Sequence, residues 1–220
     1  MNLQTALNNF QAEFKEKVPA EAAATMERAA NELLQEFEAR NLIKIGDIAP
    51  DFTLADAVGN KISLKERLTK GAVILTFYRG GWCPYCNLEL RAYQQLLPEI
   101  ERLGASLIAV SPQTPDASLS TAEKNDLEFD VLSDVDLTAA RTYGLVFELS
   151  QELKALYQQW GIDLPKNNGN NEWKLPVPGT FVIDQNGRIA ASYINTDYTK
   201  RLEPKEAIAA LQKLSHAAAV

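Results

Sequence analysis

The sequence has few of the residues that bind metals or stabilise secreted domains. Its 220 residues include two cysteines, Cys83 and Cys86, and a single histidine, His216, near the C-terminus. A structural zinc site needs four ligands, which these residues do not supply together, so we expect no metal site and no cofactor. Two cysteines confined to one motif indicate catalytic use in a reducing compartment. The expected location is therefore the cytoplasm.

Long apolar runs and basic runs are also missing. No stretch approaches the ~18 apolar residues of a membrane span, and the N-terminal segment lacks the apolar core of a signal peptide. The formal net charge is -7, and no cluster of Lys or Arg offsets it. Neither a membrane nor a nucleic acid is therefore an expected partner. The 46% apolar content is ordinary for a globular protein with a sizeable core.

One stretch combines a strand, a glycine turn and a helix that begins at the cysteines. The apolar, β-rich run at 72–77 predicts a buried strand, and a pair of glycines then ends it. Pro84 suits the first position of a helix, which places Cys83 at the N-cap and Cys86 at the third helical position. The unpaired N–H groups of a helix N-terminus favour a thiolate. Two thiols one turn apart are also within reach of a disulfide, so we expect Cys83 and Cys86 to pair.

The first forty residues predict a helical hairpin ahead of the main domain. Apolar residues share a helical face in the first segment, and Pro19 suits the start of a second helix that reaches about Arg40. We expect a helical extension over residues 1–42 and a redox domain over residues 43–220. The hairpin either packs on its own chain or forms the contact of a homodimer, and both alternatives stay open here.

The later elements predict an α/β domain. Because a strand follows the cysteine helix, it should run parallel to the strand at 72–77. Two short strands flank a Gly59-Asn60 turn, and a polar stretch at 161–173 indicates a loop that is either a functional flap or simply mobile. Further strands are expected at 105–110, 129–132, 177–184 and 188–193, and helices at 115–125, 138–143, 148–160 and 204–216.

Three stretches together resemble the AhpC/TSA proteins, the peroxiredoxins, in the branch that carries Cys-Pro-X-Cys. They are Gly-Asp-Ile-Ala-Pro-Asp-Phe-Thr-Leu at 46–54, Phe-Tyr-Arg-Gly-Gly-Trp-Cys-Pro-Tyr-Cys at 77–86, and Pro-Gly-Thr-Phe-Val-Ile-Asp at 178–184. The resemblance implies a thioredoxin-like α/β fold, a central mixed sheet flanked by helices, here with an N-terminal helical hairpin. It also implies a cis peptide bond before Pro178, facing the cysteines.

The sequence departs from the family pattern at the positions that carry the chemistry. In a gapless match Arg79 replaces a proline, Cys83 replaces a threonine, Cys86 takes the place of the peroxidatic cysteine, and Glu89 matches a glutamate. The arginine of Arg-Gly-X-Phe is replaced by Pro178. This register makes Cys86 the thiol that attacks peroxide, whereas a thioredoxin-like register makes Cys83 the nucleophile and Cys86 its resolver. The gapless match favours Cys86 for the attack on peroxide, whereas the expected exposure of the N-cap thiol favours Cys83 for exchange with a reducing partner.

The same positions give a set of expected substrate-binding residues, with Arg79 as a functional cation and Trp82 as a half-exposed wall. Cys83, as an N-cap residue, is expected to face solvent, and Glu89 is expected to be an exposed charge on the helix. The substrate-binding set is Arg79, Trp82, Val177, Pro178 and Thr180.

The resemblance implies a thiol-dependent peroxidase that reduces hydrogen peroxide or organic hydroperoxides through the Cys83–Cys86 pair. A thioredoxin-type or glutathione-type donor would restore the thiols. Two other functions remain open. One is a thioredoxin-like thiol–disulfide oxidoreductase, and the other is a non-enzymatic redox-sensing or interaction protein.

Overall fold

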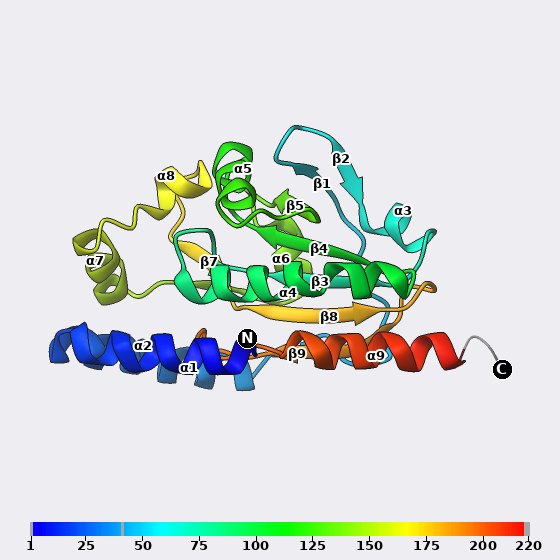
Figure 1. Ribbon diagram of the computed structural model, residues 1–220. Helices are drawn as coiled ribbons and strands as arrows, with labels where there is room; N and C mark the ends of the chain where they lie inside the picture. Colours follow the sequence, from blue (N-terminus) through cyan, green and yellow to red (C-terminus); the bar gives the residue numbers. More distant parts are fainter. Residues whose placement is uncertain (1, 41, 218–220) are drawn as a thin grey trace.

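A computed structural model describes the backbone of residues 2–40 and 42–217, and two helices lead into a layered α/β domain (Figure 1). The helices are α1 (Leu3–Lys17), α2 (Ala20–Glu38), α3 (Leu64–Leu68), α4 (Pro84–Arg102), α5 (Pro115–Lys124), α6 (Thr138–Thr142), α7 (Gln151–Gln159), α8 (Leu164–Asn168) and α9 (Pro204–Ala217). The strands are β1 (Thr53–Asp56), β2 (Lys61–Ser63), β3 (Val73–Phe77), β4 (Ser106–Ser111), β5 (Asp130–Ser133), β6 (Val146–Glu148), β7 (Lys174–Pro176), β8 (Gly179–Ile183) and β9 (Ile189–Ile194).

The central sheet is mixed, as the thioredoxin-like fold requires. Its order is β2-β1-β5-β4-β3-β8-β9, and β6 and β7 form a separate two-stranded sheet. Strand β4 runs parallel to both β3 and β5, whereas β8 runs antiparallel to β3 and to β9. The expected parallel pairing after the cysteine helix and the expected antiparallel return are both confirmed. Strand β3, which leads to the cysteines, therefore lies inside the sheet.

Alternate residues of β3 pack on opposite faces of the sheet, as the period of a strand dictates. Val73, Leu75 and Phe77 join the core that α3 and α6 cover. Ile74 joins the core that α4 and α9 cover, together with Val182 of β8. All five β3 residues are buried, so the strand is held on both sides and fixes the start of the loop that follows it.

The N-terminal hairpin packs on its own chain. Helix α1 lies against α4, and α2 lies against α7, with α1, α2 and α9 along the same side of the molecule (Figure 1). The backbone N–H groups of Leu3 and Gln4 donate to the carboxylate of Glu203, at 3.3 and 3.1 Å. A negative charge at a helix N-terminus is favourable, so Glu203 anchors α1. A homodimer contact through the hairpin stays a prediction.

Two sequence-based boundaries were wrong. Glu148, the expected first residue of a helix, is instead the last residue of strand β6 and pairs with Lys174 in the small sheet, and helix α7 begins only after Ser150. The Ser150 side chain accepts from the Leu153 N–H at 3.2 Å and so caps α7. The expected loop at 161–173 contains the short helix α8, which Asp163 caps.

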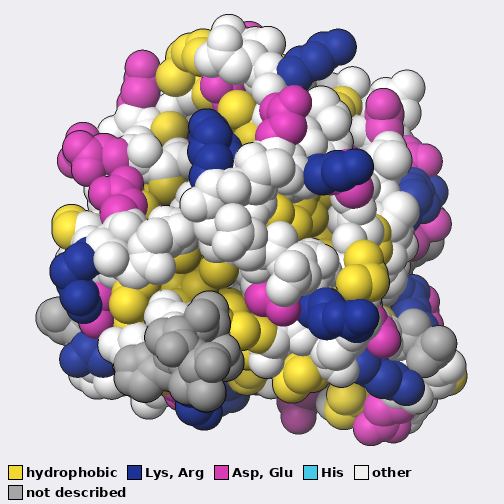
Figure 2. All heavy atoms as spheres, turned by 90° about the vertical axis from the view of Figure 1, so that its right-hand side faces the viewer, with side chains coloured by type: hydrophobic (Ala, Val, Ile, Leu, Met, Phe, Trp, Pro, Cys, Tyr) yellow, Lys and Arg dark blue, Asp and Glu magenta, His cyan; other side chains and the backbone are white. Residues whose placement is uncertain are grey.

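The surface in Figure 2 mixes charges of both signs. On the described part of that face, Lys and Arg side chains alternate with Asp and Glu side chains around a central apolar hollow (Figure 2). This part of the face therefore carries no continuous patch of one sign. Across the described chain, no helix is both long enough and apolar enough to cross a membrane.

Candidate active site

The loop between β3 and α4 needs glycine at a defined place. Gly80 has a φ of +145°, and a Cβ there would lie 2.4 Å from the Trp82 indole nitrogen, so any side chain would clash. The Gly80 carbonyl accepts from the Cys83 N–H at 3.0 Å. Cys83 is then the N-cap of α4 and Pro84 its first residue. The expected strand, turn and helix are confirmed.

Both cysteines are reduced and buried, which corrects the expectation that Cys83 faces solvent. Cys83 is 1% exposed and Cys86 is 0% exposed. The cover comes from distant parts of the chain: Leu3 and Leu7 of α1 and Tyr198 of the β9–α9 segment pack in the same apolar cluster as the two cysteines. The N-cap position exposes a side chain on an isolated helix, but here the cluster encloses it.

The electrostatics of the pair favour one shared thiolate. Burial raises the pKa of Cys83, but hydrogen bonding with the Cys86 thiol and the charges of Arg79 and Arg201 outweigh burial and lower this pKa to about 6. For Cys86, burial together with the neighbouring Cys83 raises the pKa well above its ordinary value. Because the two thiols interact so closely, they titrate as a pair. The directions of the two shifts therefore favour ionisation of Cys83 before Cys86.

Arg201, a buried arginine that the sequence analysis missed, contacts the sulfur of Cys86. Arg201 lies between β9 and α9 and is 5% exposed. Its Nη2 donates to Cys86 Sγ at 3.3 Å, and its Nε donates to Glu89 Oε2 at 2.6 Å. Glu89 is 1% exposed, so the expectation of a solvent-exposed charge was wrong. Glu89 lies on the buried face of α4, where the positive charge of Arg201 compensates the negative charge of its carboxylate.

The protonation state of Glu89 determines how far its carboxylate offsets the positive charge of Arg201 beside the thiols. Burial raises the pKa of Glu89 to about 7, against the opposing effect of Arg201 and with a further increase from Cys86. For Arg201, burial favours loss of the proton, but the negative charge of Glu89 outweighs it and raises the pKa. The arginine therefore stays charged, whereas Glu89 changes its charge near neutral pH.

Thr180 supports this network from the sheet. Its hydroxyl lies 3.5 Å from Glu89 Oε1 and 3.1 Å from the hydroxyl of Thr76. The two threonines face each other directly in the β3–β8 pairing. Thr180 thus orients the carboxylate that holds Arg201, a positioning contact on Glu89 in addition to the substrate contact expected from the sequence.

Arg79 also lies at the site. It is the second residue after β3, directly after Tyr78. It is 3% exposed, and its Nη2 donates to the Tyr157 hydroxyl. Its guanidinium lies over three aromatic rings, 4.2 Å from Tyr198, 5.0 Å from Trp82 and 5.6 Å from Tyr157. Trp82 is half-buried beside it, as expected for a wall of the site. Cation–π attraction partly compensates for the buried charge.

The expected cis bond before Pro178 is not present. The described residues contain no cis peptide bond, so Val177–Pro178 is trans. The trans form is the more stable one for most X-Pro bonds, by about 0.5–1 kcal/mol. The Val177 N–H also donates to the Leu145 carbonyl at 2.9 Å, so this group is not free to pair with an extended substrate. Val177 and Pro178 instead line a cavity that Arg79 also lines.

Comparison with protein families identifies the chain. The model of the AhpC/TSA family matches residues 45–192, more than half of the sequence. The chain belongs to the AhpC/TSA family. It is 27% identical over 168 residues to the thiol-disulfide oxidoreductase ResA of Bacillus cereus, 76% of this chain and 79% of that protein. It is also 27% identical over 154 residues to a Mycobacterium tuberculosis protein that carries a peroxiredoxin name, 70% of this chain and 87% of the relative.

Solved structures of related proteins share the fold of this AhpC/TSA chain. The peroxidoxin BcpB of Mycobacterium tuberculosis aligns with a TM-score of 0.62 at 24% identity, over 78% of this chain and 98% of that one. PrxQ of Xylella fastidiosa aligns with a TM-score of 0.61 at 21% identity, over 81% and 99%. This AhpC/TSA chain is accordingly a thiol-based redox protein with a thioredoxin-like fold.

The arrangement suits two-electron thiol chemistry. Cys83 and Cys86 lie one helical turn apart, and each sulfur has a buried arginine among the charges that act on it. One thiolate is present for attack and one thiol for closing a disulfide. No short sequence pattern points to Arg201, because it is one basic residue in a polar segment and 115 positions from its sulfur partner.

Proposed function

We propose that this AhpC/TSA protein is a thiol-dependent peroxidase that reduces hydrogen peroxide or organic hydroperoxides. The single observation that carries the proposal is the buried Cys83–Cys86 pair, with Arg201 bonded to Cys86 Sγ and the charges of Arg79 and Arg201 favouring a thiolate on Cys83. Family membership supports the same chemistry. The proposed location remains the cytoplasm, and the proposed reductant is a thioredoxin-type or glutathione-type donor.

In the proposed reaction, a thiolate attacks one oxygen of the peroxide. The O–O bond breaks, the sulfur becomes a sulfenic acid, and the other oxygen leaves as an alcohol or water after taking a proton. The second thiol then attacks the sulfenic sulfur, which closes the Cys83–Cys86 disulfide and releases water. Two equivalents of an external thiol reduce the disulfide and leave as their own disulfide. Buried cationic groups stabilise the negative charge that develops on the leaving oxygen.

We assign the attack on peroxide to Cys83, although the gapless sequence match favours Cys86. The thiolate is the reactive form of a cysteine, and the pKa of about 6 for Cys83 supports its ionisation at neutral pH. Cys86, whose pKa is raised, then acts as the resolving thiol. The contact of Arg201 with Cys86 Sγ stabilises that sulfur as a thiolate when the disulfide is later reduced.

Intact-mass analysis tests the function directly. The reduced protein is mixed with one equivalent of peroxide and its mass is measured with and without thiol alkylation. We expect the loss of two hydrogens and of both alkylation sites, which marks an internal disulfide. Peroxide consumption over many turnovers with a thiol donor then establishes catalysis. Unchanged thiols after peroxide treatment would defeat the proposal.

A thiol–disulfide oxidoreductase is the second candidate. The resemblance to ResA and the low pKa of the N-cap thiol favour it. An insulin-reduction assay beside a peroxide-consumption assay separates the two candidates. The burial of both cysteines works against a protein disulfide as substrate, because a small peroxide needs less space. Stoichiometric oxidation without turnover in either assay would instead favour the third alternative, a redox sensor.

A further inference from the structure

The two buried arginines of the site differ in their partners. Arg201 forms an ion pair with Glu89 at 2.6 Å. Within the part of the chain that the structure describes, no carboxylate forms an ion pair with Arg79, and its Nε, fully buried, has no hydrogen-bond partner. A buried charge is costly without a partner, and the aromatic rings around Arg79 compensate only in part. Arg79 therefore has unused capacity to bind an anion.

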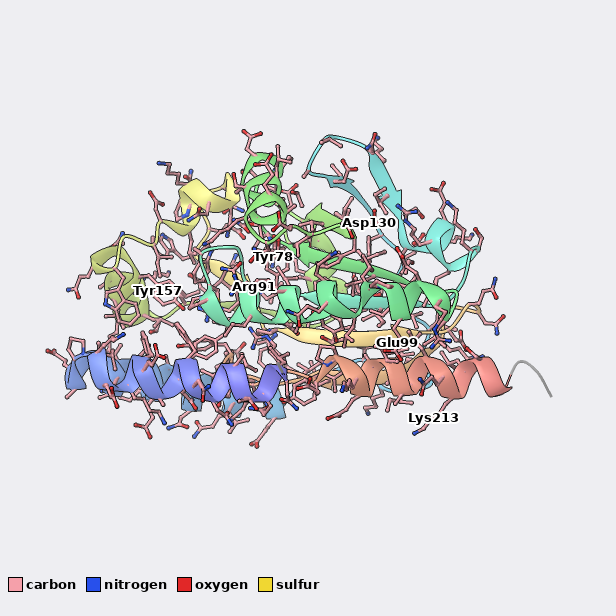
Figure 3. The ribbon with its side chains drawn as sticks, viewed as in Figure 1. Tyr78, Arg91, Glu99, Asp130, Tyr157 and Lys213 are labelled. Carbon is pink, nitrogen blue, oxygen red and sulfur yellow. The ribbon has the colours of Figure 1, made fainter. Side chains whose placement is uncertain are left out.

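A small cavity opens beside this arginine, beneath helix α2. It has a volume of about 40 Å³, which is room for roughly three waters or one small polar group. Arg79 and Tyr157 line it on one side, and Tyr157 lies on α7 above the N-terminal helices (Figure 3). Its other lining residues are mostly apolar, and Met26, Ala30 and Leu33 of α2 supply one wall. The cavity thus combines one cationic side chain with mostly apolar walls.

The redox state of Cys83 decides whether Arg79 has a counter-charge. In the reduced protein the Cys83 thiolate lies in the same aromatic surroundings, since Cys83, Trp82 and Tyr198 pack in one cluster. Formation of the disulfide removes that negative charge and leaves the charge of Arg79 uncompensated. An anion is therefore attracted most strongly to the oxidised protein, which is the form that a reductant must meet.

We propose that the cavity under α2 binds the carboxylate of a small aliphatic thiol on Arg79, so that the reductant of this protein is a low-molecular-weight, carboxylate-bearing thiol. The inference rests on the proposed function in one respect, the formation of the Cys83–Cys86 disulfide. It goes further by naming the chemistry of the donor and the place where it binds. Burial of both cysteines, at 1% and 0% exposure, supports a small donor over a protein.

The proposed step is a thiol–disulfide exchange. The thiolate of the bound donor attacks Cys83 Sγ, the Cys83–Cys86 bond breaks, and Cys86 leaves as a thiolate beside Arg201 and then takes a proton. A second donor thiolate attacks the donor sulfur of the mixed disulfide, which releases the donor as its disulfide and restores the Cys83 thiolate. Two donor thiols are oxidised for each protein disulfide that is reduced.

A series of small thiols that differ in charge tests the proposal. The protein is oxidised with diamide, which needs no peroxidase activity, and the disulfide is confirmed by mass. Reduction by mercaptopropionate, mercaptoethanol and cysteamine is then followed by alkylation and mass, at equal thiolate concentrations. We expect mercaptopropionate to react about fivefold or more faster than mercaptoethanol, and cysteamine to react most slowly, because only the first presents a carboxylate to Arg79. Propionate should inhibit the first reaction selectively.

Two variants localise the effect. Arg79→Gln should bring the mercaptopropionate-to-mercaptoethanol ratio to about one, and the ratio cancels any change in the reactivity of the sulfurs. Ala30→Phe, which fills the cavity from α2, should slow mercaptopropionate. The matched control is Ala24→Phe, at an exposed position of the same helix, which should leave the rates unchanged.

The possible results separate this inference from the peroxidase. Equal rates for the three thiols in the wild-type protein, or a preference that survives Arg79→Gln, would overturn the carboxylate site, whatever the protein does with peroxide. Faster reduction by thioredoxin than by any small thiol would point to a protein donor and would also overturn it. Failure of peroxide to form the disulfide, with the charge preference intact, would remove only the peroxidase. If Arg79→Gln does not fold, the wild-type series and Ala30→Phe decide.

Discussion

Arg201 joins Cys86 to Glu89: its Nη2 lies 3.3 Å from the sulfur and its Nε 2.6 Å from the carboxylate. Both side chains of the ion pair are almost fully buried, at 2% and 1% exposure. In such surroundings removal of one partner leaves an uncompensated charge, whereas removal of both is much less costly. The pair is therefore expected to control both the folding and the thiol chemistry of the site.

A double-mutant cycle tests the stability of this pair. We expect Arg201→Met to lower the free energy of unfolding by about 3–5 kcal/mol, because Glu89 is then buried without its partner. The double variant Arg201→Met/Glu89→Leu should lose less than the sum of the single losses. Chemical denaturation of the reduced proteins measures each value.

The control is a surface ion pair. Arg141 and Glu172 lie 3.1 Å apart with both side chains about half exposed, so Arg141→Met should change the free energy of unfolding by less than ~1 kcal/mol. Strict additivity in the Arg201–Glu89 cycle would show that the two buried charges do not interact and would contradict the assigned network.

Local patterns in the sequence predicted most of the fold around the cysteines. The apolar run of β3, the glycines after it and Pro84 act within a few residues of one another, so the strand, the turn and the N-cap at Cys83 follow from neighbouring chemistry. The sheet order is consistent with the β-α-β connection rule. These features needed no long-range information.

The charges and the cover of the site depend on contacts that short patterns do not record. Glu89 shares the helical face of Cys86 and Tyr93, but a carboxylate is seldom buried without a partner, and only Arg201, from the far end of the chain, makes its burial tolerable. Cys83 is covered because α1 packs over the N-terminus of α4. The trans bond at Pro178 was missed for a different reason, since that expectation came from the family resemblance alone.

The first thiol of the pair to ionise, Cys83, should do so well below the range of a free cysteine. We expect the thiolate absorbance of the reduced protein to titrate with a midpoint of about 6, and the rate of alkylation to rise through the same pH range. Since this pKa is lower in the folded protein than in an unfolded chain, ionisation stabilises the folded form. That stabilisation is present above the ordinary thiol pKa and is lost as the pH falls through about 6.

Arg79→Met should shift this midpoint upward, because it removes a positive charge that lowers the pKa of Cys83. Lys154→Met is a suitable control, since Lys154 pairs with the exposed Glu148 and is not among the charges that act on the thiols. An unchanged midpoint in Arg79→Met would assign the lowered pKa to other groups.

Single-turnover trapping decides which sulfur attacks peroxide. We expect Cys86→Ser to form a sulfenic acid on Cys83 after one equivalent of peroxide, detectable with a sulfenate-specific reagent, and to over-oxidise because its resolving thiol is missing. Cys83→Ser should react much more slowly, since the raised pKa of Cys86 leaves little thiolate. A sulfenate that forms rapidly on Cys86 in Cys83→Ser would reverse the two roles, in agreement with the gapless family match.

The anchoring of α1 by Glu203 should control access to both thiols. The carboxylate of Glu203 accepts the N–H groups of Leu3 and Gln4 at the start of α1, and Leu7 of the same helix packs in the cluster of the cysteines. Glu203→Gln keeps the shape of the side chain but removes the charge that favours the helix N-terminus, a change of about 0.3–1 kcal/mol. We therefore expect alkylation of the reduced thiols by a neutral reagent to become about two- to fivefold faster.

This effect must come from opening of the cover and not from the thiol itself. The midpoint of the thiolate titration should accordingly stay the same in Glu203→Gln. The control is Glu206→Gln, a carboxylate in the first turn of α9 that makes no contact with α1 among the described hydrogen bonds. Equal alkylation rates in Glu203→Gln and in the wild-type protein, at the same thiolate fraction, would show that the thiols are reached by a route that does not require α1 to move.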